Sequence, residues 1–430
     1  MNQLNTKPKV IEKKYLATFI IITSLFALWG FANDITNPMV AAFRTVMNIS
    51  NTKAAFVQFA FYGGYATMAI PAALFIRKFS YKSGIILGLA LYAIGALMFW
   101  PAAHYQNFGF FLISLYVLTF GLAFLETTAN PFILALGSHE TSTRRLNLAQ
   151  SFNPIGSLLG MFIASNYILS SLDSEERDAA GELIYNTLPQ AKQLIIREHD
   201  LDIIRNPYVL LGGIVILVLL IVLFKKMPKV ESTNKSTITQ IFKNLISNKN
   251  YREGVVAQMF YVGAQIMCWT FIIQYAESIG IPKATAQKYN IIAMVCFLSF
   301  RFLSTALMRY INAKKLLMYF AIGGITTLSV TIFIGGITGL YTLMATSAFM
   351  SLMFPTIYGI ALEDVKPEDS ALGASGLVFA IVGGAVMPPL QGAIIDGNGL
   401  MGIPSANISF ILPWICFVVI AIYAYNTQRH

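Results

Sequence analysis

The strongest constraint on the fold of this 430-residue chain is a series of long apolar runs that recurs along its whole length. A helix needs about 20 apolar residues to cross the hydrocarbon core of a bilayer, and the sequence contains twelve runs of that size. They lie at 15–37, 53–75, 84–103, 107–136, 145–171, 206–226, 251–276, 285–308, 314–335, 338–362, 371–395 and 404–426. We therefore predict an all-α, polytopic membrane protein with twelve transmembrane helices.

The composition supports this class and excludes others. Apolar residues make up 56% of the chain and charged residues only 12%, whereas about 25% of the residues of a soluble domain are charged. The net charge of +10 comes from the loops, and no basic tract is interleaved with aromatic residues, so we expect no nucleic-acid partner. The expected surroundings of the chain are the lipid bilayer.

Motifs of enzymes, metal sites and cofactor sites are absent from the sequence. Cys268, Cys296 and Cys416 lie separately in apolar runs, and the four histidines are scattered. This pattern supports neither a disulfide framework nor a metal site. No G-x-x-x-x-G-K-[ST] motif occurs, which argues against ATP-driven pumping. We expect no cofactor and no enzymatic activity.

The loops indicate the topology and the division of the chain. Most of the 30 Lys and Arg residues fall on the side that holds both termini, so the positive-inside rule predicts cytoplasmic termini. A basic segment at 227–250 separates an N-terminal six-helix half, 1–226, from a C-terminal half, 251–430. Two such halves suggest repeats related by an axis along the membrane normal, with a ligand site between them near the midplane.

The first helix carries a group of polar residues that are costly in lipid and therefore tend to face a pathway. Trp29, Asn33 and Asn37 are spaced four apart on one face, and Asp34 lies beside them. Pro38 lacks an N–H group and should bend the helix near Asp34. We predict part of a binding site here; the alternative is that the two asparagines only bond neighbouring helices.

The fourth helix holds the sharpest candidate, Glu126, with Asn130 one turn later on the same face and Pro131 next to it. A low dielectric disfavours the charged form of a carboxyl group, so Glu126 could bind a proton and release it when its surroundings change. The alternative is a buried carboxylate that is permanently paired with a basic group.

Uncharged amides and aromatic residues recur on single faces of the fifth and seventh helices. The candidates for substrate binding there are Gln150, Asn153, Gln258, Tyr261, Gln265 and Trp269. Amides both donate and accept hydrogen bonds, and an aromatic face can pack on the C–H side of a sugar. The set fits a neutral sugar better than an ion. Hydrogen bonding between helices is the alternative role for each amide.

Two further residues are predicted to have structural or gating roles, as are Pro38 and Pro131. Arg301 lies near the cytoplasmic end of the eighth helix, where a long side chain can snorkel to the interface. Pro355 should bend the tenth helix, where a gate could hinge.

Several segments of the chain resemble the fucose permease family of the major facilitator superfamily, and the similarity runs nearly from end to end. These segments are 28–33 (LWGFAN), 77–84 (RKFSYKSG), 125–132 (LETTANPF), 145–153 (RLNLAQSFN), 261–265 (YVGAQ) and 348–351 (AFMS). The resemblance implies the fold of that superfamily and proton-coupled import of a sugar. It also implies an essential aspartate in the first helix and an essential glutamate in the fourth.

The family's glutamate falls on Glu126, and its aspartate falls on Asn37, an amide, with Asp34 about one turn earlier. Three explanations stay open: Asp34 substitutes for the aspartate, coupling depends on Glu126, or the driving ion differs. In the tenth helix the resemblance implies Gln-Tyr before the proline, where this chain has Met353 and Phe354.

The combined expectation is a bacterial inner-membrane symporter that imports L-fucose or a related hexose with a proton by alternating access. We expect it to act as a monomer. The alternatives are a sodium-coupled sugar transporter, a drug/proton antiporter and, from a different class, a sugar receptor that does not transport.

Overall fold

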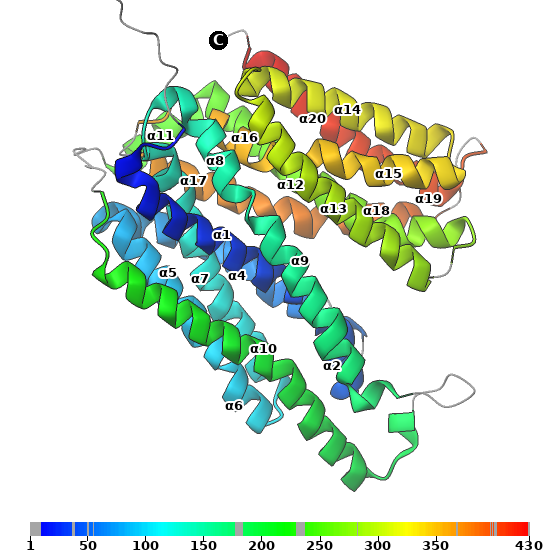
Figure 1. The fold of residues 1–430 in the computed structure, drawn as a ribbon. Coiled ribbons are helices and arrows are strands. Elements are labelled where there is room, and N and C mark those ends of the chain that lie inside the picture. Colours follow the sequence, from blue (N-terminus) through cyan, green and yellow to red (C-terminus); the bar gives the residue numbers. More distant parts are fainter. Residues whose placement is uncertain are drawn as a thin grey trace, which may run out of the picture. The chain divides into compact units, whose positions relative to one another are not determined.

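The computed structural model describes residues 10–36, 39–49, 51–54, 56–176, 184–228, 237–281, 283–366, 369–395, 397, 399 and 402–428. These residues form helices and connecting turns, and no strand is found among them (Figure 1). Twelve helical stretches within them are long and apolar enough to cross a membrane. The predicted all-α fold with twelve spans is therefore confirmed.

The first six spans are built from these helices: α1 (Leu16–Thr36), α4 (Phe56–Lys78), α5 (Tyr81–Leu97) continued by α6 (Phe99–His104), α7 (Phe108–Ala135), α8 (Ser142–Gln150) continued by α9 (Asn153–Ile163), and α10 (Gln190–Phe224). Short helices α2 (Met39–Val46) and α3 (Asn51–Ala54) connect the first two spans. A π-helical turn, Ala164–Ile168, extends α9.

The last six spans follow α11 (Ile238–Ser247), an amphipathic helix in the predicted linker. They are α12 (Lys249–Ser278), α13 (Lys283–Leu307), α14 (Ala313–Phe333), α15 (Gly336–Met350) with α16 (Met353–Ala361), α17 (Ser370–Phe379) with α18 (Gly383–Ile395), and α19 (Ser405–Ile408) with α20 (Ile411–Asn426).

Side-chain caps help to fix where several helices begin, because the first N–H groups of a helix have no partner inside it. The Ser80 hydroxyl accepts a hydrogen bond from the Ser83 amide at the start of α5, at 3.0 Å. Asn312 caps α14 in the same way through the Lys314 amide, at 2.8 Å. These caps agree with the polar loops that the sequence places between apolar runs.

The sixth span differs most from the predicted boundaries. The apolar run predicts a span at 206–226, but α10 already begins at Gln190. The extra turns are polar and include Asp200, whose carboxylate accepts hydrogen bonds from the amides of Asp173 and Ser174 at 3.0 and 2.9 Å. Hydrophobicity could not reveal these turns, because side-chain hydrogen bonding and not apolar burial holds their buried aspartate.

The fifth and tenth spans are interrupted near their middle. Helix α8 ends at Gln150 and α9 begins at Asn153, with Pro154 in its first turn, where a missing N–H group is harmless. Helix α15 ends at Met350 and α16 begins at Met353. Pro355 is the third residue of α16, so the tenth span breaks just before this proline.

Packing divides the chain into two units. The N-terminal unit comprises 20–129 and 152–229, and the C-terminal unit comprises 1–19, 130–151 and 230–430. Residues 130–151 thus pack with the later helices. The predicted division into two six-helix halves joined by a linker at 227–250 rests on the number of helices and stays a prediction.

In the N-terminal unit, α1 and α9 approach backbone to backbone at two glycines. A Cβ atom at Gly156 would lie 1.8 Å from the carbonyl oxygen of Ala27, and one at Gly30 would lie 2.1 Å from the carbonyl oxygen of Asn153. Only glycine permits this approach. It holds Asn153 against the first helix.

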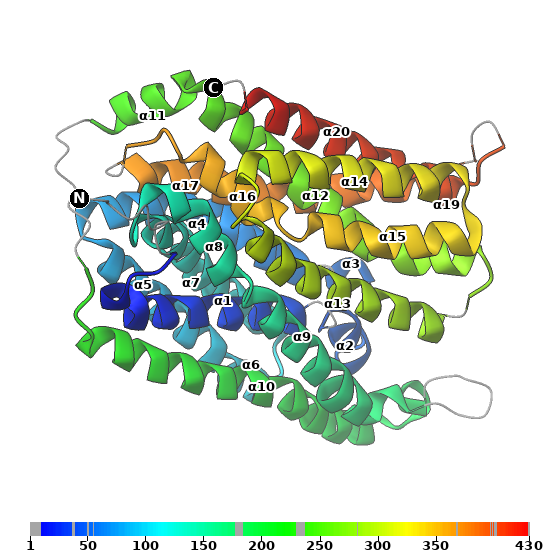
Figure 2. The same cartoon turned by 45° about the horizontal axis from the view of Figure 1, so that its top comes forward.

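In the C-terminal unit, α12 packs against α13, α15, α16, α18 and α20. Helix α14 packs against both α15 and α20 (Figure 2). Cys268 and Cys416 are buried in this unit and all three cysteines of the chain are free. Helix α12 therefore forms the centre of this unit and carries four of the predicted substrate-binding residues.

Candidate functional site

Trp29 in the N-terminal unit is held by two aromatic neighbours. Its indole Nε1 donates a hydrogen bond to the Tyr65 hydroxyl at 2.6 Å, and its ring stacks on Phe26 with centroids 5.8 Å apart. The indole is only half-buried. Trp29 is thus held by its neighbours and is partly exposed.

Asn153 contacts the same stretch of the first helix. Its Nδ2 donates a hydrogen bond to the Phe26 carbonyl oxygen at 3.2 Å. The side chain is half-buried, and its amide oxygen does not take part in this hydrogen bond. Asn153 and Trp29, which lie far apart in the sequence, are therefore brought to the same turn of α1.

Glu126 lies in the most completely buried part of α7, where residues 121–130 are all buried. Its own side chain is 0% exposed. The carboxyl group interacts electrostatically with Tyr65, the partner of Trp29. In this conformation the carboxyl group is therefore closed off from solvent.

Asp34 is the second acid of this unit. It is 8% exposed and interacts electrostatically with Tyr62, which lies one turn before Tyr65 on α4. Asn33, beside Asp34, is half-buried. Asn37 and Pro38, two of the predicted residues, lie outside the described residues. The face that Asn37 was predicted to share with Trp29 and Asn33 stays a prediction.

In the C-terminal unit, a hydrogen bond joins two of the predicted amides, those of Asn130 and Gln150. Gln150 Nε2 donates a hydrogen bond to Asn130 Oδ1 at 2.7 Å, and both side chains are buried. Pro131 follows Asn130 inside α7, which continues to Ala135. On α8, Asn147 Nδ2 donates to the Thr356 hydroxyl at 3.1 Å. Residues 130–151 are therefore tied to α16 by polar contacts.

Helix α12 places its four predicted residues in different surroundings. The Tyr261 hydroxyl donates to the Met350 carbonyl oxygen at 3.2 Å, and Trp269 Nε1 donates to the Ser347 hydroxyl at 3.2 Å. Gln265 is half-buried. Gln258 is 0% exposed, and neither its amide nitrogen nor its amide oxygen has a hydrogen-bond partner among the described residues.

Arg301 lies six residues before the end of α13 and is also buried. Its guanidinium stacks over Phe297, with the central carbon 4.9 Å from the ring centroid. Phe297 in turn meets Trp269 edge to face, with ring centroids 5.0 Å apart. Phe354, at the position where a tyrosine was expected, lies 6.2 Å from the Tyr261 ring. Trp269, Phe297 and Arg301 thus form a row of two aromatic rings and a cation.

Sequence reasoning missed the aromatic partners Tyr62, Tyr65 and Phe297. The two tyrosines are three residues apart, the spacing of neighbours on one helix face, but aromatic residues are too common in these apolar runs for that spacing to stand out. Phe297 could have been found from its position one turn before Arg301, because residues four apart are neighbours on one helix face and a cation there can contact the ring.

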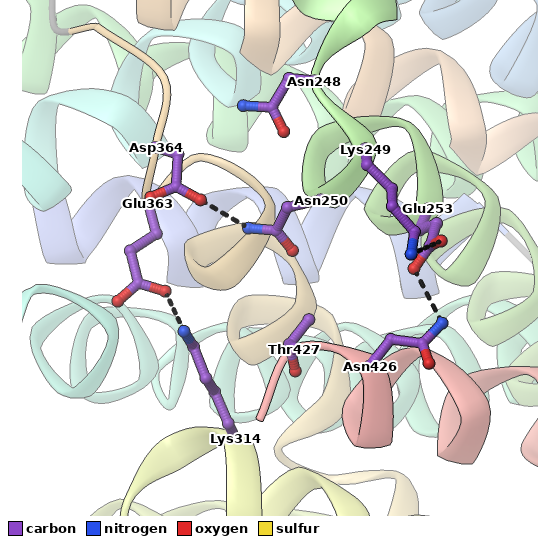
Figure 3. Close-up of a pocket in the computed structure, with 9 residues that line it drawn as sticks. All are labelled: Asn248, Lys249, Asn250, Glu253, Lys314, Glu363, Asp364, Asn426 and Thr427. Atoms are coloured by element: carbon purple, nitrogen blue, oxygen red, sulfur yellow. Dashed lines mark hydrogen bonds and ion pairs between the residues drawn. The ribbon is translucent and has the colours of Figure 1, made fainter. Parts of the chain in front are cut away.

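A separate polar cavity of about 400 Å³ lies where α12 and α14 begin and where α16 and α20 end (Figure 3). Lys314 Nζ lies 2.8 Å from the Glu363 carboxylate, and Asn426 Nδ2 donates to Glu253 at 3.1 Å. None of its nine lining residues was predicted to bind the substrate, and none is aromatic. These paired charges suit contacts between helix ends better than a sugar site.

The fold also brings His199 close to Asp173 and Asp200. The sequence did not predict this group, because Asp173 is distant along the chain and His199 and Asp200 are consecutive residues of a helix. His199 Nδ1 lies 3.2 Å from Asp173 and 3.5 Å from Asp200. Asp200 already accepts two backbone N–H groups. The group therefore joins the turn after the fifth span to α10.

The comparisons with known proteins agree with this arrangement. The family model of the Major Facilitator Superfamily matches residues 17–388. The chain is 63% identical over 423 residues to the L-fucose-proton symporter of Haemophilus influenzae, covering 98% of this chain and 99% of that protein. It is 36% identical over 421 residues to the L-fucose-proton symporter of Escherichia coli K12, covering 96% and 93%.

A solved structure is similar as well. The crystal structure of FucP, a Major Facilitator Superfamily transporter in the outward conformation, matches with a TM-score of 0.87 and 33% sequence identity. The match covers 96% of this chain and 99% of that one. The chain therefore belongs to the fucose permease family of the Major Facilitator Superfamily, as the resemblance predicted.

Proposed function

We propose that this chain is a transporter, and not an enzyme, that imports L-fucose or a closely related neutral monosaccharide together with a proton. Two relatives that match nearly the whole chain are L-fucose-proton symporters of bacteria. The observation in the structure that carries the proposal is the enclosed acid Glu126, which lies beside the Trp29–Tyr65 pair.

The coupling follows from the cost of a charge in this environment. An ionised carboxylate is unfavourable away from water, so the enclosed Glu126 is expected to carry a proton. A neutral carboxyl group can donate a hydrogen bond to a sugar hydroxyl, whereas a carboxylate only accepts. Sugar binding then favours the protonated state, and the proton is released when a conformational change admits water. Asp34, near Tyr62, is the second acid that can take part.

Both units carry residues to which we assign sugar binding. In the N-terminal unit we assign this role to Trp29, Asn33, Asn37 and Asn153. In the C-terminal unit we assign it to Asn130, Gln150, Gln258, Tyr261, Gln265 and Trp269. Several of these amides are bonded to protein groups in this conformation, as Gln150 is to Asn130. They must exchange those bonds for sugar hydroxyls, which alternating access permits because helices move during the cycle.

The chain acts as a multi-pass protein of the bacterial inner membrane. We assign both termini to the cytoplasm, which the excess of Lys and Arg in the loops on that side supports. Pro38, Pro131 and Pro355 are assigned to the bending of helices during the cycle. We expect a monomer to be sufficient, because each chain carries its own set of site residues.

Transport by the wild-type protein in proteoliposomes tests the proposal. We expect addition of L-fucose to the outside to raise the external pH without an imposed gradient, since sugar and proton enter together. Replacing sodium with choline should leave uptake unchanged. The proposal fails if L-fucose, glucose, galactose, fructose and N-acetylglucosamine all move no protons, or if uptake stops without sodium. Efflux of lipophilic cations in place of sugar uptake would instead indicate a drug antiporter.

A further inference from the structure

Arg301 in the C-terminal unit is a buried cation without the partners that such a group normally has. Only 4% of the residue is exposed. Its Nε and Nη1 atoms are buried and have no hydrogen-bond partner among the described residues, and no described carboxylate forms an ion pair with it. Buried charges are otherwise almost always paired and hydrogen-bonded. The guanidinium therefore has unused donors.

Arg145 of the same unit shows what a structural arginine looks like in this protein. It is fully buried, and it donates to the carbonyl oxygens of Ile133 at 2.7 Å and Leu134 at 2.6 Å. It donates further to the Thr141 hydroxyl at 3.2 Å. These groups lie at and after the end of α7, where carbonyls lack helical partners. Arg301 has no comparable set, so a structural role does not account for it.

The immediate neighbours of Arg301 orient it without consuming its donors. Phe297 packs under the guanidinium plane, and a cation over a ring keeps its N–H groups directed outward at the edge. The ionisable side chain that interacts with the guanidinium is Tyr261, and the Tyr261 hydroxyl already donates to Met350. The fork of Arg301 is thus held in place but left unpaired.

Two other unpartnered groups occur on helices that pack around the same region. Gln258 lies one turn before Tyr261 on α12, and Ser351 follows Met350, the partner of Tyr261. Both are fully buried, and their side-chain polar atoms have no partner in the described part of the chain. Three buried polar side chains near Tyr261 therefore have donors or acceptors that a polar ligand could satisfy.

We propose that Arg301 binds the transported sugar and determines its specificity, by donating two parallel hydrogen bonds to neighbouring hydroxyl oxygens. This inference rests on the function proposed above. The guanidinium presents five donors in a planar fork and no acceptor, which matches two oxygens on adjacent carbon atoms. The substrate class is a neutral sugar with a vicinal diol. An amino sugar is rejected, because its ammonium group would face a cation.

Binding of deoxy sugars to purified protein tests this assignment. Dissociation constants are measured for L-fucose, its 2-, 3- and 4-deoxy derivatives and 2-amino-2-deoxy-L-fucose. Loss of a hydrogen bond to a charged group weakens binding by about tenfold or more. Wild-type protein should therefore bind the derivatives that lack an Arg301-bound hydroxyl at least about tenfold more weakly than L-fucose. In Arg301→Gln these penalties should shrink to within about twofold.

Matched variants separate a binding role from a structural one. Arg301→Lys keeps the charge but not the fork, so it should restore the penalty at one hydroxyl and not at two. Arg252→Gln, at an exposed arginine that donates to the Ile246 carbonyl, should retain all wild-type ratios. The proposal is overturned if Arg301→Gln weakens every sugar by the same factor or leaves every ratio unchanged.

A measurement on the unmodified protein covers the case in which Arg301→Gln does not fold. Phenylglyoxal labelling of Arg301 and Arg252 is quantified by mass spectrometry with and without L-fucose. We expect L-fucose to slow labelling at Arg301 at least about threefold, as expected for donors occupied by a ligand, and to leave Arg252 unchanged. Equal labelling at Arg301 overturns the assignment. Failure of wild-type protein to bind any neutral monosaccharide would instead refute the proposed function.

Discussion

Trp29 donates a 2.6 Å hydrogen bond to the hydroxyl of Tyr65. Tyr65 in turn interacts electrostatically with Glu126. A residue proposed to bind the sugar and the residue proposed to carry the proton are therefore joined through one tyrosine. A change at either residue can reach the other without a direct contact.

Tyr65→Phe should weaken this link while keeping the ring. Loss of a neutral hydrogen bond costs about 1 kcal/mol, so we expect the KM for L-fucose to rise by about fivefold. We also expect the dependence of KM on pH to become shallower, because the indole no longer shares a partner with Glu126. Uptake measured across a pH series checks both. Tyr116→Phe, at a half-buried tyrosine of α7 whose hydroxyl bonds Thr67, is the control and should keep the wild-type pH dependence.

The approach of α1 to α9 gives a prediction for stability. Gly156→Ala would place a Cβ atom 1.8 Å from the Ala27 carbonyl oxygen. Such overpacking should destabilise the protein by about 1–3 kcal/mol and displace Asn153. Gly213→Ala on α10 is a matched control, because nothing lies within 4 Å of its new Cβ. Thermal unfolding in detergent should show a lower midpoint for Gly156→Ala and an unchanged or higher one for Gly213→Ala. Equal midpoints would contradict the described packing.

The two buried arginines should respond differently to neutralisation. Arg145→Gln leaves carbonyls at the end of α7 without donors and should destabilise the protein by about 3 kcal/mol or more. Arg301→Gln removes a buried charge without a partner and should cost less than about 1 kcal/mol, although it alters sugar binding. Both midpoints can be read from one set of unfolding curves. A larger loss at Arg301 than at Arg145 would show that Arg301 is structural.

The sequence predicted the helices well because long apolar runs leave little choice in lipid: every backbone group must be bonded within the segment. It missed the first turns of α10, which are polar and are held by Asp200 and other side chains. The fifth and tenth spans break next to Pro154 and Pro355, as expected for residues that lack a backbone N–H group.

The candidate site was predictable in its residue types but not in its partners. Glu126, Asn130 and Gln150 stand out because polar groups in spans are costly, yet the bond between Asn130 and Gln150 joins two helices and follows no local spacing. The position of Arg301 near a helix end predicts a snorkelling side chain. Its lack of partners depends on all the helices around it, and a single segment cannot reveal that.

The central claim is that one proton on Glu126 moves with each sugar, and Glu126→Gln tests it most directly. The amide has the shape of the protonated acid but cannot ionise. Sugar-induced proton movement and L-fucose uptake are measured in parallel in proteoliposomes, with Glu253→Gln, in the polar cavity of Figure 3, as the control. The account predicts that Glu126→Gln moves no protons with L-fucose and cannot accumulate it against a gradient, while Glu253→Gln does both. Proton-coupled accumulation at the wild-type level in Glu126→Gln would contradict it.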